Sequence, residues 1–154
     1  MDKFQKARNS AAAILAVKMY TCRELCDKLI KKGFDKDLAE QVTGEFISAG
    51  FLNDAEYASM YISDQVNLGA KGTYRIKQEL IKKGISLSII EDALACSDID
   101  TLSALREYIS LRGLCDNIHT RRDLEKLKAR LARRGFSLSE INSCLAEYTF
   151  HFDD

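Results

Sequence analysis

The sequence predicts an all-α protein built from three tandem three-helix repeats. The pentapeptide LIKKG occupies residues 29–33 and again 80–84, and the related LARRG occupies 131–135. The closing glycines are spaced 51 residues apart, and a fixed period of this length is the signature of repeat architecture. The chain contains no proline, and no alternating apolar pattern persists long enough to form a strand. We therefore expect repeats over residues 1–51, 52–102 and 103–154, stacked as an elongated, curved helical array.

Helix start and stop signals in the first repeat explain the pentapeptide. Thr21 followed three residues later by Glu24 is a capping box, which begins a helix. Gly33 suits the left-handed position that ends a helix. Asp35 can cap the next helix, and Phe34 before it can contact an apolar residue one turn further on. The repeated pentapeptide is thus predicted to be a helix end: an apolar anchor, a basic last turn and a glycine stop.

The other two repeats carry the same signals. Gly84 and Gly135 take the place of Gly33, and Ser137 with Glu140 forms another capping box. Asn53 is expected to cap the first helix of the second repeat. Apolar and aromatic residues at helical spacing are expected along the first helices, which we predict to end before Gly69 and Gly113 in the second and third repeats: Phe4, Ala11, Ile14, Leu15, Met19, Tyr57, Met60, Tyr61, Val66, Leu102, Leu105, Tyr108, Ile109 and Leu111.

Composition limits the class of protein. Hydrophobic residues make up 46% of the chain and charged residues 30%, and the formal net charge is zero. These values are ordinary for a soluble globular protein. No apolar run approaches the ~18 residues that span a bilayer, and no signal-peptide pattern is present. We therefore expect a cytoplasmic protein with no membrane segment.

Cysteines and catalytic groupings give no sign of an active site or a metal centre. The cysteine count is five, an odd number without disulfide-framework spacing, which predicts reduced thiols. Cys22 and Cys26 stand one helical turn apart, but no second pair of cysteines or histidines has ligand spacing. No Ser/His/Asp or Cys/His grouping is visible. We expect no cofactor, no metal and no enzymatic activity, with core packing for Cys22, Cys26, Cys96, Cys115 and Cys144.

Charge is distributed unevenly along the chain. Residues 121–135 hold seven basic and two acidic residues, whereas residues 35–64 hold seven acidic residues and one lysine. The basic pairs before the repeated glycines can complement helix dipoles or bind phosphates or acidic groups of a partner. The segment GAKGT at 69–73 lacks the spacing of a phosphate loop and is predicted to be a helix–helix turn. Candidate partner or DNA contacts are Lys31, Lys32, Lys71, Arg75, Lys82, Lys83, Arg121, Arg122, Lys126, Arg130, Arg133 and Arg134.

Four segments together resemble a known family. ELCDKLIKKGF, FLNDAEYA, AKGTYRIKQELIKKGI and LARRGF follow one another in an order and spacing similar to the RecX regulatory proteins, over residues 7–148. The resemblance implies a protein that docks in the groove of the RecA–DNA filament. It also implies that the protein limits filament growth, ATP hydrolysis and strand exchange without catalysing a reaction. Positions that match the family pattern are Leu52, Asp54, Tyr57, Ala58, Gly69, Lys71, Gly72, Arg75, Ile76, Glu79, Leu80, Lys83, Gly84 and Ile85.

Two functions other than regulation of the RecA filament are also compatible with the sequence. Helix, glycine turn and capped helix also describe a helix-turn-helix, so the alternative is a stand-alone DNA-binding protein. The helices after Gly33, Gly84 and Gly135 would then read bases, yet their first turns carry almost no Arg, Lys, Asn or Gln. A scaffold for some other protein is the second alternative. The expected partner is therefore the RecA filament, with single- or double-stranded DNA left open, and the expected state is a monomer.

Overall fold

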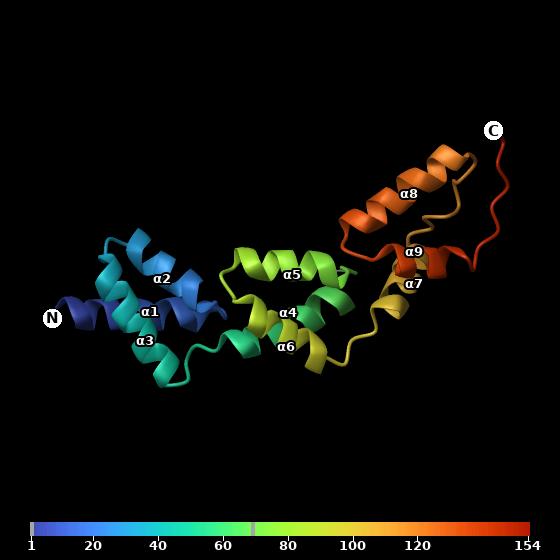
Figure 1. Cartoon of the computed structure of the whole chain (residues 1–154). Helices are drawn as coiled ribbons and strands as arrows, with labels where there is room; N and C mark the ends of the chain where they lie inside the picture. The colour runs from blue at the N-terminus through green and yellow to red at the C-terminus, as the bar shows by residue number, and fades with distance from the viewer. Residues whose placement is uncertain (1, 69) are drawn as a thin grey trace. The chain divides into compact units, whose positions relative to one another are not determined.

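The computed structural model describes residues 2–68 and 70–154, and the regular secondary structure of these residues consists of helices joined by turns. No strand occurs among these residues, so the predicted all-α class is confirmed. None of the described helices is both long and apolar enough to cross a membrane. Gly69, expected to end a helix, lies outside the described residues. The helices are α1 (Lys3–Val17), α2 (Cys22–Lys31), α3 (Lys36–Ser48), α4 (Asp54–Asn67), α5 (Thr73–Lys82), α6 (Leu87–Cys96), α7 (Thr101–Leu111), α8 (Arg121–Arg133) and α9 (Leu138–Leu145) (Figure 1).

The limits of α2 and α3 follow from side chains within a few residues. The Thr21 hydroxyl accepts a hydrogen bond from the Glu24 N–H, and the Glu24 carboxylate accepts one from the Thr21 N–H, so the predicted capping box forms. Gly33 ends α2 with a φ of 108°, a conformation that is costly for residues with a side chain. Asp35 then caps α3 by accepting from the Leu38 N–H.

The same signals recur later in the chain. Gly84 and Gly135 have φ values of 92° and 99°. Ser137 and Glu140 form the predicted capping box at the start of α9. Asn53 accepts a hydrogen bond from the backbone N–H three residues on, at the start of α4. These boundaries could be predicted because each depends on contacts within one helical turn.

Two compact units divide the chain. One holds Met1–Met60 with Leu80–Ala95, and the other holds Tyr61–Glu79 with Cys96–Asp154. The divisions fall inside α4 and α5 and at the last residue of α6. The division into three sequence repeats stays a prediction.

The core of the first unit lies among α1, α2 and α3 (Figure 1). Leu25 and Leu29 of α2 are fully buried one turn apart, as their spacing predicts. Phe34 packs against this core from the turn after Gly33. The buried members of the cluster are Ala7, Ala11, Ile14, Leu25, Leu29, Leu38, Ala39, Val42 and Leu52.

A core of the same kind lies among α7, α8 and α9 in the second unit. Leu127 and Leu131 are buried on α8, four residues apart, just as the two leucines of α2 are. Phe136 is buried directly after the glycine stop. The buried members are Leu105, Tyr108, Ile109, Leu127, Leu131, Phe136, Ile141, Cys144 and Leu145.

Five residues expected on an apolar helix face or, for Cys96, in the core are instead exposed, and helix geometry explains each. Met19 lies beyond the end of α1. The buried stripe of α4 recurs every four residues and leaves Met60 on another face. Phe4, Cys96 and Leu111 lie in the first or last turn of their helices, where neighbouring elements do not cover them.

The cysteines are unpaired thiols. Cys144 is buried, and Cys22, Cys26 and Cys115 are partly buried, so four of the five take part in packing. Burial raises the pKa of the Cys22 thiol to about 12, and the Asp54 carboxylate adds to the shift, so this thiol stays protonated at neutral pH. Among the described residues no group of three or more Cys, His, Asp or Glu is placed to hold a metal ion.

Candidate partner-binding surface

Half of the candidate basic residues are exposed and unpaired. Among residues 2–68 and 70–154, the side chains of six of them form no ion pair and no hydrogen bond. Long cationic side chains of this kind keep their full charge available to a partner. The six are Lys31, Lys32, Lys82, Arg122, Lys126 and Arg133.

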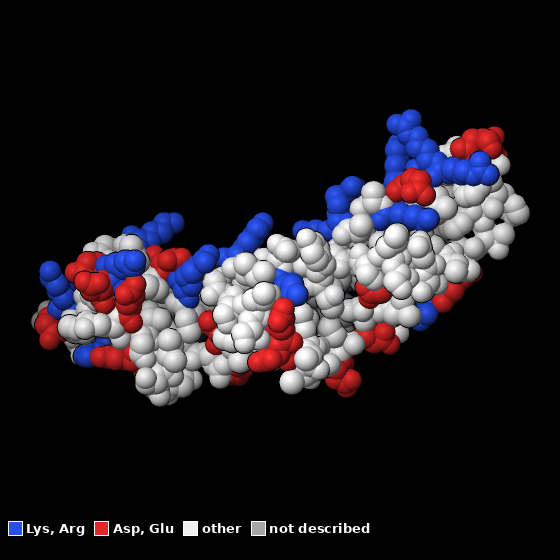
Figure 2. Space-filling view, viewed as in Figure 1, with Lys and Arg blue, Asp and Glu red and all other residues white. Residues whose placement is uncertain are grey.

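Helix ends and one helix face position these six cations. Lys31, Lys82 and Arg133 are the last residues of α2, α5 and α8, where positive charge also complements the helix dipole. Arg122 and Lys126 stand four residues apart on α8 and therefore share one of its faces. Figure 2 shows Lys and Arg side chains projecting over α8.

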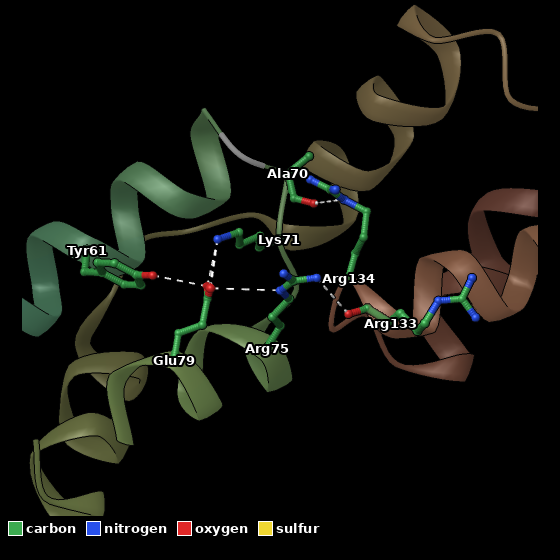
Figure 3. Close-up of polar contacts among 7 residues, drawn as sticks. All are labelled: Tyr61, Ala70, Lys71, Arg75, Glu79, Arg133 and Arg134. Carbon is green, nitrogen blue, oxygen red and sulfur yellow. Dashed lines mark hydrogen bonds and ion pairs between the residues drawn. The ribbon is translucent and has the colours of Figure 1, made fainter. Parts of the chain in front are cut away.

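Lys71 and Arg75 both make polar contacts within the protein, although the Arg75 side chain is 45% exposed, and their role in partner binding stays a prediction. The Lys71 ammonium lies 2.8 Å from each carboxylate oxygen of Glu79, and only 21% of its side chain is exposed. The Tyr61 hydroxyl donates to the same carboxylate at 3.1 Å. The Arg75 guanidinium lies 3.9 Å from Glu79 and donates to the Arg133 carbonyl at 3.3 Å (Figure 3).

Lys83 is also held by neighbours. Its ammonium lies 3.6 Å from the Glu24 carboxylate and 5.9 Å from the centre of the Tyr57 ring. Burial by itself would lower the pKa of Lys83, but its electrostatic interactions and hydrogen bonds with Glu24 and Tyr57 outweigh burial and raise the pKa above its usual value. The side chain therefore stays charged and serves a contact inside the first unit.

The remaining three candidates also have intramolecular contacts. Arg134 donates to the Ala70 carbonyl at 3.1 Å (Figure 3). Its guanidinium also lies 4.5 Å from the centre of the Tyr108 ring. Arg130 donates to the Tyr108 hydroxyl at 3.4 Å. The Arg121 guanidinium lies 5.6 Å from the centre of the Phe152 ring. Arg134 is thus a structural residue, whereas Arg121 and Arg130 are exposed residues with weaker contacts.

The first unit contains a contact that the sequence did not predict, between the end of α5 and the start of α2. The Thr21 hydroxyl donates to the Lys83 carbonyl at 2.6 Å, and the Arg23 guanidinium donates to the Lys82 carbonyl at 2.7 Å. A Cβ added to Gly84 would lie 2.5 Å from the Arg23 Cβ. We call this contact, of Thr21 and Arg23 with residues 82–84, the first joint.

The second unit contains a related contact, between the end of α8 and the start of α5. The backbone N–H of Gly72 donates to the Arg134 carbonyl at 2.8 Å, and that of Tyr74 donates to the Gly135 carbonyl at 3.2 Å. A Cβ added to Gly72 would overlap the Gly135 carbonyl group. We call this contact, of residues 72–75 with Arg133–Gly135, the second joint.

Both joints use the repeated pentapeptide, which gives its end a second role besides stopping a helix. The last four carbonyls of a helix lack partners within the helix and need other hydrogen-bond donors. At residues 82–84 and 133–135 the start of another helix supplies them. Thr21 was predicted only as a helix cap, and the recurrence of the glycine stop was the one signal in the sequence that pointed to a shared contact.

Comparison with known proteins gives the family. The profile of the first three-helix domain of RecX matches residues 7–45, and that of the second three-helix domain matches residues 53–94. Regulatory protein RecX of Clostridium perfringens (strain 13 / Type A) is 35% identical over 154 residues, which cover 96% of this chain and 71% of that protein. The chain belongs to the RecX family. Regulatory protein RecX of Halorhodospira halophila is 28% identical, with 92% of this chain and 88% of that protein covered.

Solved RecX structures have the same fold. The crystal structure of RecX from Lactobacillus salivarius matches with a TM-score of 0.79 and 30% identity, over 94% of this chain and 95% of that one. A second crystal structure of a regulatory protein RecX matches with a TM-score of 0.83 and 26% identity, over 96% of this chain and 73% of that one. The helical architecture is therefore that of RecX proteins.

Proposed function

We propose that this RecX-family chain binds the RecA–DNA filament in the cytoplasm and limits its growth, ATP hydrolysis and strand exchange during recombinational DNA repair. The chain acts by binding and catalyses no reaction in this proposal. The observation that carries it is a set of exposed cations, in a chain of this family, that have no ion pair or hydrogen bond within the described part of the chain: Lys31, Lys32, Lys82, Arg122, Lys126 and Arg133.

The positions of these cations fit an extended target better than a small ligand. They are spread over α2, α5 and α8, and no pocket has to form for them to act. Several weak contacts to one filament add through effective concentration, so no single strong site is needed. Phosphates of DNA and acidic side chains of a protein filament are both suitable counter-charges.

The scarcity of basic residues in α3, α6 and α9 argues against the helix-turn-helix alternative. In α3 the Asp35 carboxylate is used to cap the helix, and the lysine beside it pairs with Glu40. No basic residue occurs in α6 or α9. A recognition helix needs donors in its first turns to reach base edges and phosphates.

A binding comparison tests the proposal. The protein is added at near-physiological salt to naked single-stranded DNA, to naked duplex, and to a RecA–ATP–DNA filament, and ATP hydrolysis is followed in the same samples. We expect tight binding to the filament only, with ATP turnover falling at substoichiometric protein. Equal or tighter binding to naked duplex with unchanged ATP hydrolysis would overturn the proposal in favour of a DNA-binding protein.

A charge reversal identifies the contact. Lys126→Glu combined with Arg133→Glu should weaken filament binding by about tenfold or more, because two attractive contacts become repulsive. The matched control is Lys3→Glu with Lys6→Glu, which makes the same change of net charge on exposed residues of α1. Arg134 is left unchanged, because its guanidinium holds the Ala70 carbonyl. Equal losses in both double variants would show a response to net charge alone.

A further inference from the structure

The end of α2 is an unoccupied copy of the helix end used in the two joints. Residues 29–33 are identical to residues 80–84, LIKKG in both cases. A Cβ added to Gly84 or Gly135 meets atoms of another helix start, at 2.5 Å in each case, whereas a Cβ added to Gly33 has nothing within 4 Å. The helix ends at Gly84 and Gly135 are therefore each covered by the start of another helix, whereas the helix end at Gly33 is uncovered.

The carbonyl groups at this open end have no donor among the described residues. In the first joint the Lys82 and Lys83 carbonyls accept side-chain hydrogen bonds. Their counterparts one repeat earlier are the Lys31 and Lys32 carbonyls, and no hydrogen bond from residues 2–68 or 70–154 reaches either of them. Both lysines are exposed. The end of α2 thus presents two acceptors and two ammonium groups.

The first joint defines the helix start that such an end accepts. The start of α2 supplies a capping threonine, Thr21, an arginine at the second helical position, Arg23, and an acid at the third, Glu24. The threonine and the arginine donate to carbonyls, and the carboxylate lies 3.6 Å from the Lys83 ammonium.

Among the helices that the structure describes, one other start has this order of residues. α8 begins with capping Thr120, followed by Arg122 at the second position and Asp123 at the third, and it also forms a capping box. The Thr120 hydroxyl accepts from the Asp123 N–H at 3.0 Å, which leaves its own proton to donate. The Arg122 side chain is exposed and forms no hydrogen bond or ion pair with another described residue.

We propose that a second copy of this chain docks the start of its α8 onto the open end of α2. In this contact the Thr120 hydroxyl donates to the Lys32 carbonyl, and the Arg122 guanidinium donates to the Lys31 carbonyl. The Asp123 carboxylate faces the Lys32 ammonium, as Glu24 faces Lys83 in the first joint. Repetition of this contact generates a head-to-tail chain of copies, since donor and acceptor surfaces differ.

The residues after α9 compete for the start of α8. The Asp154 carboxylate accepts from the Arg121 N–H at 3.2 Å, and the Asp153 N–H donates to the His119 carbonyl at 2.7 Å. The Phe152 ring lies against the Arg121 guanidinium. These tail residues, Phe152–Asp154, have to leave before a second copy can dock, so the unaltered chain is expected to be mainly monomeric.

Sedimentation equilibrium of the full chain tests the proposal without RecA or DNA, so its failure is distinct from failure of the proposed function. Phe152→Ala with Asp154→Ala releases the tail. This opened variant should show an average mass that rises with concentration across the micromolar to millimolar range. If the opened variant stays a single chain over that range, the proposal is overturned.

Further changes in the opened variant locate the contact. Arg122→Ala should weaken association by about tenfold or more, because it removes a charge-assisted hydrogen bond. Lys32→Glu should weaken it too, because it places a carboxylate against Asp123. Lys126→Ala, one turn further along α8, is the matched control and should leave the self-association of the opened variant unchanged. Association that survives Arg122→Ala or Lys32→Glu would place the contact elsewhere and overturn the proposal.

Discussion

The two joints use the same kind of helix end as acceptor but differ in what donates to it. In the first joint the donors are side chains, the Thr21 hydroxyl and the Arg23 guanidinium. In the second joint they are mainly backbone N–H groups, those of Gly72 and Tyr74. The closing glycine is packed tightly in both. The acceptors are main-chain carbonyls in both joints, because every helix end exposes carbonyls. The hydrogen-bond donors can therefore be either side chains or backbone N–H groups.

The difference has a steric consequence. Backbone donors require the two main chains to approach closely, and the second joint therefore needs a glycine on both sides, Gly72 and Gly135. Side-chain donors reach further, so the first joint has a buried threonine, Thr21, where the second has Gly72. The second joint should be the more sensitive of the two to any added side-chain atom.

The largest effect is expected from Gly72→Ala. The added methyl group would overlap the Gly135 carbonyl, and neither backbone can move without losing the hydrogen bonds of the second joint. We expect a loss of about 3 kcal/mol in the free energy of unfolding. Urea unfolding followed by circular dichroism measures it. Gly44→Ala is the control, because Gly44 lies in α3 with open space around it and should gain up to ~1 kcal/mol. Similar effects at both positions would contradict the close approach.

An intermediate effect is expected in the difference between Gly84→Ala and Gly33→Ala, which isolates the part of the loss that is due to the first joint. Both glycines have positive φ, so each substitution costs about 1–2 kcal/mol in backbone strain. Only Gly84 lies against Arg23, and its substitution should cost about 2 kcal/mol more because the first joint has to open. The same urea titration measures both. Equal losses would mean that the first joint contributes little to stability.

The smallest effect is expected from comparing Thr21→Val with Thr120→Val. Both threonines cap a helix through a capping box, so both substitutions lose a cap. Thr21 also donates to the Lys83 carbonyl, and its substitution should cost about 1 kcal/mol more because that hydrogen bond is lost. If Thr120→Val lowers the free energy of unfolding as much as Thr21→Val does, the whole effect is due to the lost helix cap and not to the hydrogen bond with Lys83.

How far the sequence predicts this structure depends on the range of each interaction. The capping boxes at Thr21 and Ser137 and the stop at Gly33 were predictable, because each is decided within one helical turn. The joints were not, because they pair residues about 60 positions apart in the chain. A repeated motif indicates that a contact recurs, but it does not show which residues elsewhere in the chain make that contact.

The candidate surface shows the same limit. Lys71 and Lys126 look alike in the sequence, yet Lys71 pairs with Glu79, whereas Lys126 has no ion pair with any residue that the structure describes. Arg133 and Arg134 are neighbours, but only Arg134 has its guanidinium bonded within the fold. Availability of a cation depends on which carboxylates and carbonyls the tertiary structure brings near it, and composition alone contains no such information.

At Lys82 and Arg133 the main chain and the side chain serve different purposes. Their carbonyls accept the hydrogen bonds of the joints, while their side chains remain unpaired among the described residues. Any amino acid except proline at such a position offers the same main-chain acceptor without disturbing the helix. A side-chain substitution at these positions can therefore change which partner is bound while the main-chain hydrogen bonds of the joints are kept. Helix ends are for this reason favourable places for binding specificity to evolve.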